Sequence, residues 1–153
     1  SLIRTYGDFV DAANLSREAD VKVRTEIVKA LGNLLNAQAA KPNAATVKQI
    51  AEHLLKIIDP QAEPKEVARV VEAGIFSLRY VLPKKPEFVP YHQKAAEKLI
   101  LLMRAADAGG GSKAGIVDAL TYITRQPFGD NVKRWEDWYD RTFKGAKLGK
   151  TGP

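Results

Sequence analysis

The sequence predicts an all-α protein, an array of helical hairpins wound into a right-handed superhelix and closed by a C-terminal helix. Two observations support this prediction. A helical phrase around Val23 returns around Val67 and again around residue 112, at shifts of 44 and 45 residues. Apolar residues follow helical spacing in every long segment, and no segment shows the alternation of a strand. Periods of about 40–47 residues are typical of two-helix solenoid repeats.

Both helices of the repeating unit recur, which indicates three hairpins followed by a C-terminal cap. The two shifts align Leu31 with Ile75 and then with Leu120, and the first shift also aligns Leu34 with Leu78. We expect Leu31, Ile75 and Leu120 to be buried, because they share one inner-helix position. The other helix of each pair aligns at steps of 45 residues through Phe9, Leu54 and Leu99.

The first four helices follow from periodicity and from breaking residues. Residues 2–13 form the first helix, and the second runs from residue 16 or 20 to residue 39, before Pro42. Thr46 is expected to cap a third helix that ends near residue 58. Pro64 suits the first turn of the fourth helix, which ends before Pro83.

Three further helices complete the array. The fifth covers residues 91–107 and contains the longest apolar stretch, residues 99–103, which predicts a buried helix. Gly109-Gly110-Gly111 separates it from the sixth helix, which Ser112 can cap and which ends near Arg125. An aromatic-rich seventh helix covers residues 131–143.

The pair Val23-Arg24 followed by Ala30-Leu31-Gly32 resembles the second helix of HEAT repeats, which are armadillo-like α-solenoid units. In that family the Val-Arg pair opens the inner helix and the Ala-Leu-Gly step allows close helix packing. The later copies depart from this pattern, since Ala68 and Lys113 replace the arginine. These departures weaken any inference of an arginine ladder, while the hairpin architecture stays as predicted.

The C-terminal segment also resembles the closing segment of bacterial HEAT-like proteins. The resemblance rests on Phe128-Gly129-Asp130, Trp135 and Trp138-Tyr139. Together with the repeats, it covers nearly the whole chain. By analogy, small HEAT-like proteins accompany large bacterial enzyme complexes, so the resemblance implies an assembly-promoting subunit of a redox complex such as nitrite oxidoreductase.

Composition fits one globular domain over residues 1–143. The chain has 153 residues, of which 45% are hydrophobic and 27% are charged. The absence of cysteine excludes disulfides, thiolate metal sites and cysteine nucleophiles. No apolar run reaches the roughly 20 residues of a membrane span. The chain begins at Ser1 and its single methionine is Met103, which favours an exported or compartment-lumen protein over a cytoplasmic one.

The positive charge is concentrated at one end of the chain. The net charge is +6, and residues 141–153 contribute +4 of it, so the body of the chain is nearly balanced. We expect residues 144–153 to form a flexible basic tail, because they are rich in glycine and lysine. A nucleic-acid-binding domain would instead concentrate its basic residues on one face of the fold.

No pattern of residues predicts a catalytic, metal or cofactor site. His53 and His92 form no metal-ligand spacing, and the His-Glu pairs of HEAT-like hydroxylases are absent. Ser112-Lys113 after the glycines reverses the order of a nucleotide-binding loop, which favours a simple turn. The acids around Glu136 lie among basic residues, so ion pairs are expected there. We therefore expect no enzyme activity, no cofactor and no metal.

Three surfaces are candidates for a protein partner. The N-terminal helix has no repeat before it, so part of its apolar face should stay exposed. The segment 83–90 is either a spacer or a stiff, extended patch with an exposed aromatic. The last helix either seals the array or offers a binding hot spot. The candidate residues are Leu2, Ile3, Tyr6, Phe9, Lys84, Lys85, Phe88, Trp135 and Trp138.

The function predicted is a non-enzymatic scaffold for protein–protein interaction and complex assembly. It would bind a protein partner, a second copy of itself, or both, and an open head-to-tail stack would promote filaments or tubules. A second interpretation is a HEAT-like nucleic-acid-binding module, which would need a longer array and a basic cleft. A third is a lyase or chaperone for a cofactor, for which no ligand residues are found.

Overall fold

The computed structural model describes residues 1–11, 13–109 and 111–143, and these residues form seven α-helices and one short 3-10 helix without any strand. The all-α class predicted from the sequence is confirmed for this part of the chain. The predicted tail, residues 144–153, lies outside the described residues. In chain order the elements are α1 (Leu2–Asp8), α2 (Glu18–Ala37), α3 (Ala44–Ile57), α4 (Ala68–Leu78), the 3-10 helix η1 (Arg79–Val81), α5 (Val89–Gly109), α6 (Ala114–Thr124) and α7 (Val132–Thr142).

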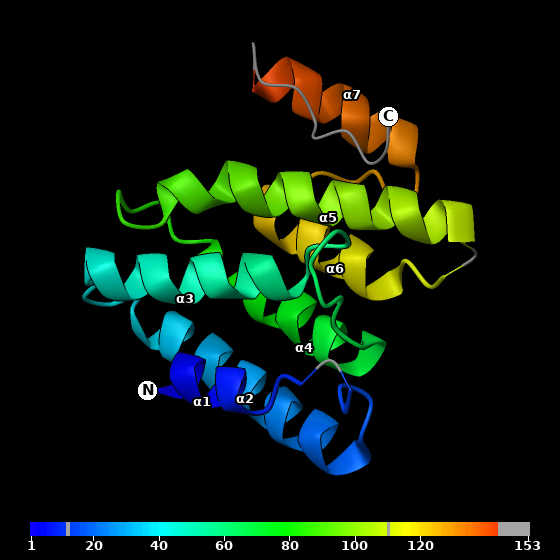
Figure 1. Cartoon of the computed structure of the whole chain (residues 1–153). Coiled ribbons are helices and arrows are strands. Elements are labelled where there is room, and N and C mark those ends of the chain that lie inside the picture. The colour runs from blue at the N-terminus through cyan, green and yellow to red at the C-terminus, as the bar shows by residue number, and fades with distance from the viewer. Residues whose placement is uncertain (12, 110, 144–153) are drawn as a thin grey trace.

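The helices are arranged in two layers. Figure 1 shows α3, α5 and α7 in front, with α2, α4 and α6 behind them. Within a layer each helix contacts the next, and across the layers α1 pairs with α2, α3 with α4, and α5 with α6. The most extensive contact between two helices joins α2 to α4. None of the described helices has the length and apolar character that crossing a membrane requires.

The interior contains the residues that the repeat predicts. Leu31, Ile75 and Leu120 are all buried, as expected from their shared position. Leu54 and Leu99 are completely buried as well, whereas Phe9, the N-terminal member of their series, is only partly buried. The predicted buried stretch in the fifth helix is confirmed, because most of residues 99–103 are inaccessible to solvent.

Two glycines allow the long contacts of α4. A Cβ atom on Gly74 would lie 2.8 Å from Cγ2 of Ile58, and one on Gly32 would collide with the side chain of Ser77. The Ser77 hydroxyl donates a hydrogen bond of 3.2 Å to the Val28 carbonyl of α2. Helix α4 therefore packs closely against both α3 and α2, since neither glycine has a side chain to hold the helices apart.

The repeat is less regular in the structure than in the sequence. Leu34 and Leu78 were aligned, yet Leu78 is fully buried while Leu34 is 47% exposed. The difference follows from position in the layer: α4 lies between α2 and α6, whereas α2 has only α4 beside it in that layer. Equivalent positions of the repeat can thus be buried on the helix in the middle of the layer and exposed on the helix at the end of the layer.

The first helix is shorter than predicted. It ends at Asp8 with Phe9 as its C-cap, and residues 10, 11 and 13 are not helical. Asp11 replaces helical bonds with local ones, because its carboxylate accepts from the Ala13 N–H at 3.0 Å and from the Asn14 amide at 3.0 Å. Such side-chain bonds offer the backbone an alternative to a helix.

Helices α3 and α4 also begin at residues other than those predicted. The cap of α3 is Asn43, whose Oδ1 accepts a hydrogen bond of 3.0 Å from the backbone of Thr46, the residue predicted as the cap. Helix α4 begins at Ala68 after a loop, so Pro64 does not occupy its first turn. The loop ends at Glu66, whose carboxylate accepts from the Val67 N–H at 2.8 Å.

The last three helices lie close to their predicted ranges. Lys113 is the N-cap of α6 in place of Ser112, and the Ser112 hydroxyl accepts a 3.4 Å hydrogen bond from the Ala114 N–H. Asn131 caps α7 through a 3.1 Å hydrogen bond from the Arg134 N–H. The sequence thus predicted where these helices lie, but their first residues differ from the prediction by one or two positions.

Candidate interaction surface

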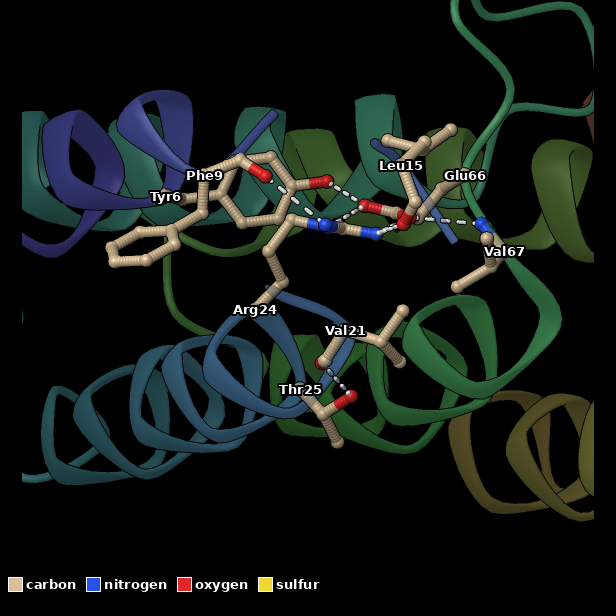
Figure 2. A network of polar contacts seen from close by, with 8 residues as sticks. All are labelled: Tyr6, Phe9, Leu15, Val21, Arg24, Thr25, Glu66 and Val67. Atoms are coloured by element: carbon tan, nitrogen blue, oxygen red, sulfur yellow. Dashed lines mark hydrogen bonds and ion pairs between the residues drawn. The ribbon is translucent and has the colours of Figure 1, made fainter. Parts of the chain in front are cut away.

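The N-terminal end is sealed by a buried network that Figure 2 shows. Arg24 of α2 donates to both carboxylate oxygens of Glu66, from Nε at 2.9 Å and from Nη2 at 2.8 Å. Its guanidinium also donates to the backbone carbonyls of Phe9 at 3.0 Å and Leu15 at 2.6 Å. The Tyr6 hydroxyl donates to the same carboxylate. This arginine therefore joins α1, α2 and the loop before α4.

Each oxygen of the Glu66 carboxylate accepts two hydrogen bonds. Oε2 accepts from Tyr6 and Arg24, and Oε1 accepts from Arg24 and the Val67 N–H. Burial alone would raise its pKa, but the hydrogen bonds from Arg24, Tyr6 and the Val67 N–H, with the charge of Arg24, hold the pKa below its usual value. Burial, followed by the hydrogen bond to Glu66, raises the pKa of Tyr6. The network is a structural lock, because a saturated carboxylate has no free acceptor for a ligand.

The predicted surface residues of α1 mostly contribute to this lock. Tyr6 is buried, which corrects its assignment to an exposed strip. Leu2 and Ile3 are partly buried and pack on the core, and Phe9 supplies the carbonyl that Arg24 binds. Residues of α2 provide most of the apolar surface that remains here, a shallow groove of about 520 Å³. Its lining is Leu2, Ala19, Lys22, Val23, Glu26, Ile27 and Ala30.

A smaller cavity of about 320 Å³ lies beside Tyr6 and His53. The two rings meet edge to face with their centroids 4.8 Å apart. Burial, and then the charge of Lys56, lowers the pKa of His53, so the ring is neutral at pH 7. His92 is half-buried, and its Nε2 lies 3.1 Å from the Pro83 carbonyl. Across the described ranges, no three His, Cys, Asp or Glu side chains are grouped to hold a metal ion.

The segment before α5 does not have the expected form. Its backbone turns, with the N–H groups of Phe88 and Val89 donating to the Lys85 carbonyl at 2.8 Å and 3.0 Å. Phe88 is fully buried, so the prediction of an exposed aromatic here is wrong. The Lys85 ammonium donates to the Ala39 carbonyl at the end of α2 and is tied to the fold. Lys84 alone of the three residues predicted here is exposed.

The aromatic residues of α7 cover the core beside α5. Trp135 and Tyr139 are fully buried, and Trp138 is partly exposed. The Trp135 indole donates to the Gly129 carbonyl at 2.8 Å, and the Tyr139 hydroxyl donates to Glu97 of α5 at 2.9 Å. Of the two interpretations of this helix, the structure therefore supports the sealing one for Trp135.

A different face carries aromatic and arginine side chains in a continuous series. The series crosses from α4 and η1 to α6, and we call it the aromatic–arginine strip. Gly74 faces α3, and Phe76 follows it by two residues, which is about 200° around a helix. Phe76 consequently points away from α3 and is 53% exposed. The strip comprises Phe76, Arg79, Tyr80, Tyr122 and Arg125.

Each member of the strip contacts the next. The Phe76 and Tyr80 rings meet edge to face at 6.2 Å. The Arg79 guanidinium carbon lies 4.4 Å from the Phe76 centroid and 4.7 Å from the Tyr122 centroid. The Arg125 guanidinium carbon lies 5.0 Å from that same Tyr122 centroid. Two cations therefore converge on one tyrosine ring, where cation–π attraction orients both of them.

These two guanidinium groups have no anionic partner in the described structure. All ion pairs among the described residues involve other side chains, and the Nε atom of Arg79 is buried without a hydrogen-bond acceptor. Both arginines line an open pocket of about 410 Å³. Its other lining residues are Asp118, Thr121, Tyr122, Gln126 and Pro127.

A second hollow is lined by Phe76, whose ring contacts Arg79 of the pocket. It has a volume of about 380 Å³ and lies between α2 and α4. Lys29 and Asn33 of α2 form one wall, and Ala73, Phe76 and Tyr80 contribute the apolar part. Two members of the strip, Phe76 and Tyr80, thus line an apolar hollow, and the other three line a cationic pocket.

Sequence reasoning missed this strip, although the chain carries a signal for it. Phe76-Ser77-Leu78-Arg79 and Tyr122-Ile123-Thr124-Arg125 share an aromatic residue and an arginine three positions apart. The second copy follows the first by 46 residues. An alignment at 44 or 45 residues, chosen for the apolar positions, does not superpose the two phrases.

A comparison of the chain with known protein families, curated proteins and solved structures finds no match.

Proposed function

We propose that this protein is a non-enzymatic interaction scaffold, a HEAT-like right-handed array of three hairpins capped by α7. The two-layer order of the helices and the burial of the repeated leucine and isoleucine positions support this architecture. An array of this kind exposes one side of each layer along its whole length, which suits the docking of another protein. Under this proposal the strip across α4, η1 and α6 is the docking surface.

The observation that carries the proposal is an exposed aromatic side chain set among guanidinium groups that have no anionic partner. Phe76 is the most exposed of the large apolar side chains in the described ranges. Aromatic residues and arginine are enriched in protein interfaces and dominate their binding energy. Arg79 and Tyr122 are already held by ring contacts, so less side-chain entropy is lost when a partner binds.

The N-terminal groove is the second contact in the proposal. Its lining is mostly apolar, with Lys22 and Glu26 as the charged exceptions. A second copy seated there would make either a closed pair or a head-to-tail stack, and the stack would give the filament-promoting role inferred from the sequence. Assembly of a larger complex, including a redox complex of the kind that the HEAT resemblance implies, would then use both surfaces.

Photo-crosslinking tests the docking surface directly. A benzoylphenylalanine is placed at position 76 of the full chain, and in a control at position 48, because Lys48 is exposed on α3 in the other layer. We expect a defined protein to be crosslinked from position 76 and not from position 48 in extracts of the source cells. The partner, identified by mass spectrometry and purified, should bind the wild type and lose affinity for Phe76→Ala. Equal labelling from both positions would contradict the proposal.

Sedimentation analysis tests the N-terminal contact. Leu2 lies at the groove and is partly buried, so Leu2→Glu places a charge at its edge. We expect concentration-dependent association of the wild type and a monomeric, folded Leu2→Glu variant. A wild type that stays monomeric at high concentration would exclude self-association and leave only the partner-binding part of the proposal.

A further inference from the structure

We infer that the pocket formed by Arg79 and Arg125 is a carboxylate-binding subsite that selects an acidic residue in a protein partner. The inference rests on the function proposed above and adds the chemistry of the ligand. The partner segment would place its carboxylate in the cationic pocket and a neighbouring apolar side chain in the hollow beside Phe76.

The pocket carries unmatched positive charge. Asp118 lines the pocket but makes no ion pair with Arg79 or Arg125, so two cations and one anion surround the space. The buried Nε–H of Arg79 also lacks an acceptor. That atom is inaccessible to solvent, so a ligand in the open pocket would bind the other N–H groups of the two guanidinium groups. A ligand carboxylate there would balance the unmatched charge.

The two guanidinium groups are also preorganised. Tyr122 lies 4.7 Å and 5.0 Å from the two guanidinium carbons, so one rigid ring positions both cations. Arg125 is the C-cap of α6 and adopts a left-handed conformation with φ of 61°, which few residues other than glycine do. Guanidinium groups bind carboxylates through paired N–H donors, and these donors point outward along the edge of a stacked guanidinium.

The hollow at Phe76 and Tyr80 has an apolar wall, and Asn33 at its edge offers an amide. A segment that crosses the strip would therefore meet an apolar surface and a cationic pocket in succession. This succession predicts a short motif with one bulky apolar residue and one nearby acid.

The same features argue against a polynucleotide as the ligand. Nucleic-acid binders neutralise several phosphates, and their affinity grows with the number of cations in contact. Here the strip has two arginines without anionic partners, while Lys29 is already paired with Glu26 at 3.4 Å. A single carboxylate fits this charge balance better.

Peptide selection on the full-length protein tests the inference. A random dodecamer library is displayed and selected against the immobilised chain, and the enriched peptides are synthesised. Their affinities are measured for the wild type, Phe76→Ala, Arg79→Gln, Arg125→Gln and Arg125→Lys, with Lys48→Gln as the matched control on the other layer. Each peptide is also made in two modified forms, one with Gln or Asn in place of its acid and one with a C-terminal amide. The folding of each protein variant is checked by thermal denaturation.

We expect peptides with an apolar residue near Asp or Glu, and at least a tenfold loss of affinity in Arg125→Gln or when the peptide acid is replaced. Arg125→Lys should retain part of the affinity and Lys48→Gln all of it. Loss on C-terminal amidation alone would assign the carboxylate to a chain end in place of a side chain.

Two results would overturn the inference in different ways. Peptides that need Phe76 but bind equally to Arg79→Gln and Arg125→Gln would exclude a carboxylate subsite and leave the docking surface standing. Failure to enrich any peptide that depends on Phe76, or tighter and arginine-dependent binding of a thymidine decamer, would exclude the docking of an acidic segment altogether.

Discussion

Arg24 and Arg79 belong to the same layer of helices, yet their guanidinium groups have opposite surroundings. Arg24 is completely buried and donates to a carboxylate and two carbonyls. Arg79 is partly exposed and lies between the rings of Phe76 and Tyr122 without an anionic partner. The first arginine uses its hydrogen-bonding capacity within the fold, and the second keeps it for a ligand.

The difference shows how the same residue type can serve structure at one place and recognition at another. A buried charge must be paired and hydrogen-bonded, so Arg24 binds Glu66 permanently. Ring stacking satisfies the flat face of a guanidinium but leaves its N–H groups unused. The predictions below test whether these two roles are separate.

The largest expected effect is on the buried pair. Glu66→Gln removes the negative charge and leaves the buried Arg24 uncompensated, which should lower the free energy of unfolding by about 3–5 kcal/mol. Glu18→Gln is the matched control, because Glu18 pairs with Arg69 on the surface and should contribute less than about 1 kcal/mol. Urea denaturation measures both values, and similar small losses would show that the pair is not a lock.

A comparable loss is expected in the core of the repeat. Leu120→Ala should cost about 2–5 kcal/mol, because the residue is fully buried and its removal leaves a cavity. Leu34→Ala, at a repeat position that is 47% exposed, should cost about 0.5 kcal/mol or less. Equal effects at the two positions would contradict the difference between the middle and the end of the layer.

Much of this fold could be predicted from the sequence, because helical periodicity repeats along the chain. The burial of Leu31, Ile75 and Leu120 followed directly from that period. The Arg24–Glu66 pair could not be predicted, since Glu66 lies in a loop and is 42 residues away in sequence. The early end of α1 was missed as well, because the Asp11 carboxylate takes up local hydrogen bonds from Ala13 and Asn14 there.

The candidate site was predicted less well, because composition was a poor guide to exposure. Phe88 lies among prolines and lysines, which suggested a surface segment, but a turn directs its ring into the core. Phe76 was not among the predicted surface residues, but its position on α4 leaves it exposed. Composition could not distinguish the two rings, because their exposure depends on how each segment packs in the folded chain.

The stability of the lock should depend on pH in a definite direction. Because the pKa of Glu66 is lowered in the folded state, its contribution is present above its unfolded pKa of about 4.3 and is lost as pH falls through the folded value. The difference in unfolding free energy between wild type and Glu66→Gln should therefore shrink from pH 6 to pH 3. Asp59, whose pKa is also lowered, is present in both proteins and cancels. A difference that grows toward low pH would contradict the assignment.

The smallest expected effect on stability is at the strip. Phe76→Ala should change the free energy of unfolding by less than about 1 kcal/mol, because the ring is more than half exposed and its contacts are with surface side chains. Thermal denaturation at neutral pH measures the change. A loss of several kcal/mol would mean that the strip stabilises the fold, in the way that Arg24 does.

Binding of the crosslinked partner to the purified Phe76→Ala variant tests the central claim most directly. Val89→Ala serves as the control, since Val89 is an apolar residue of similar exposure in the other layer. Titration calorimetry should show at least a tenfold loss of affinity for Phe76→Ala, the scale of an interface hot spot, and no change for Val89→Ala. Unchanged affinity of Phe76→Ala for that partner would contradict the claim that the aromatic–arginine strip is the docking surface.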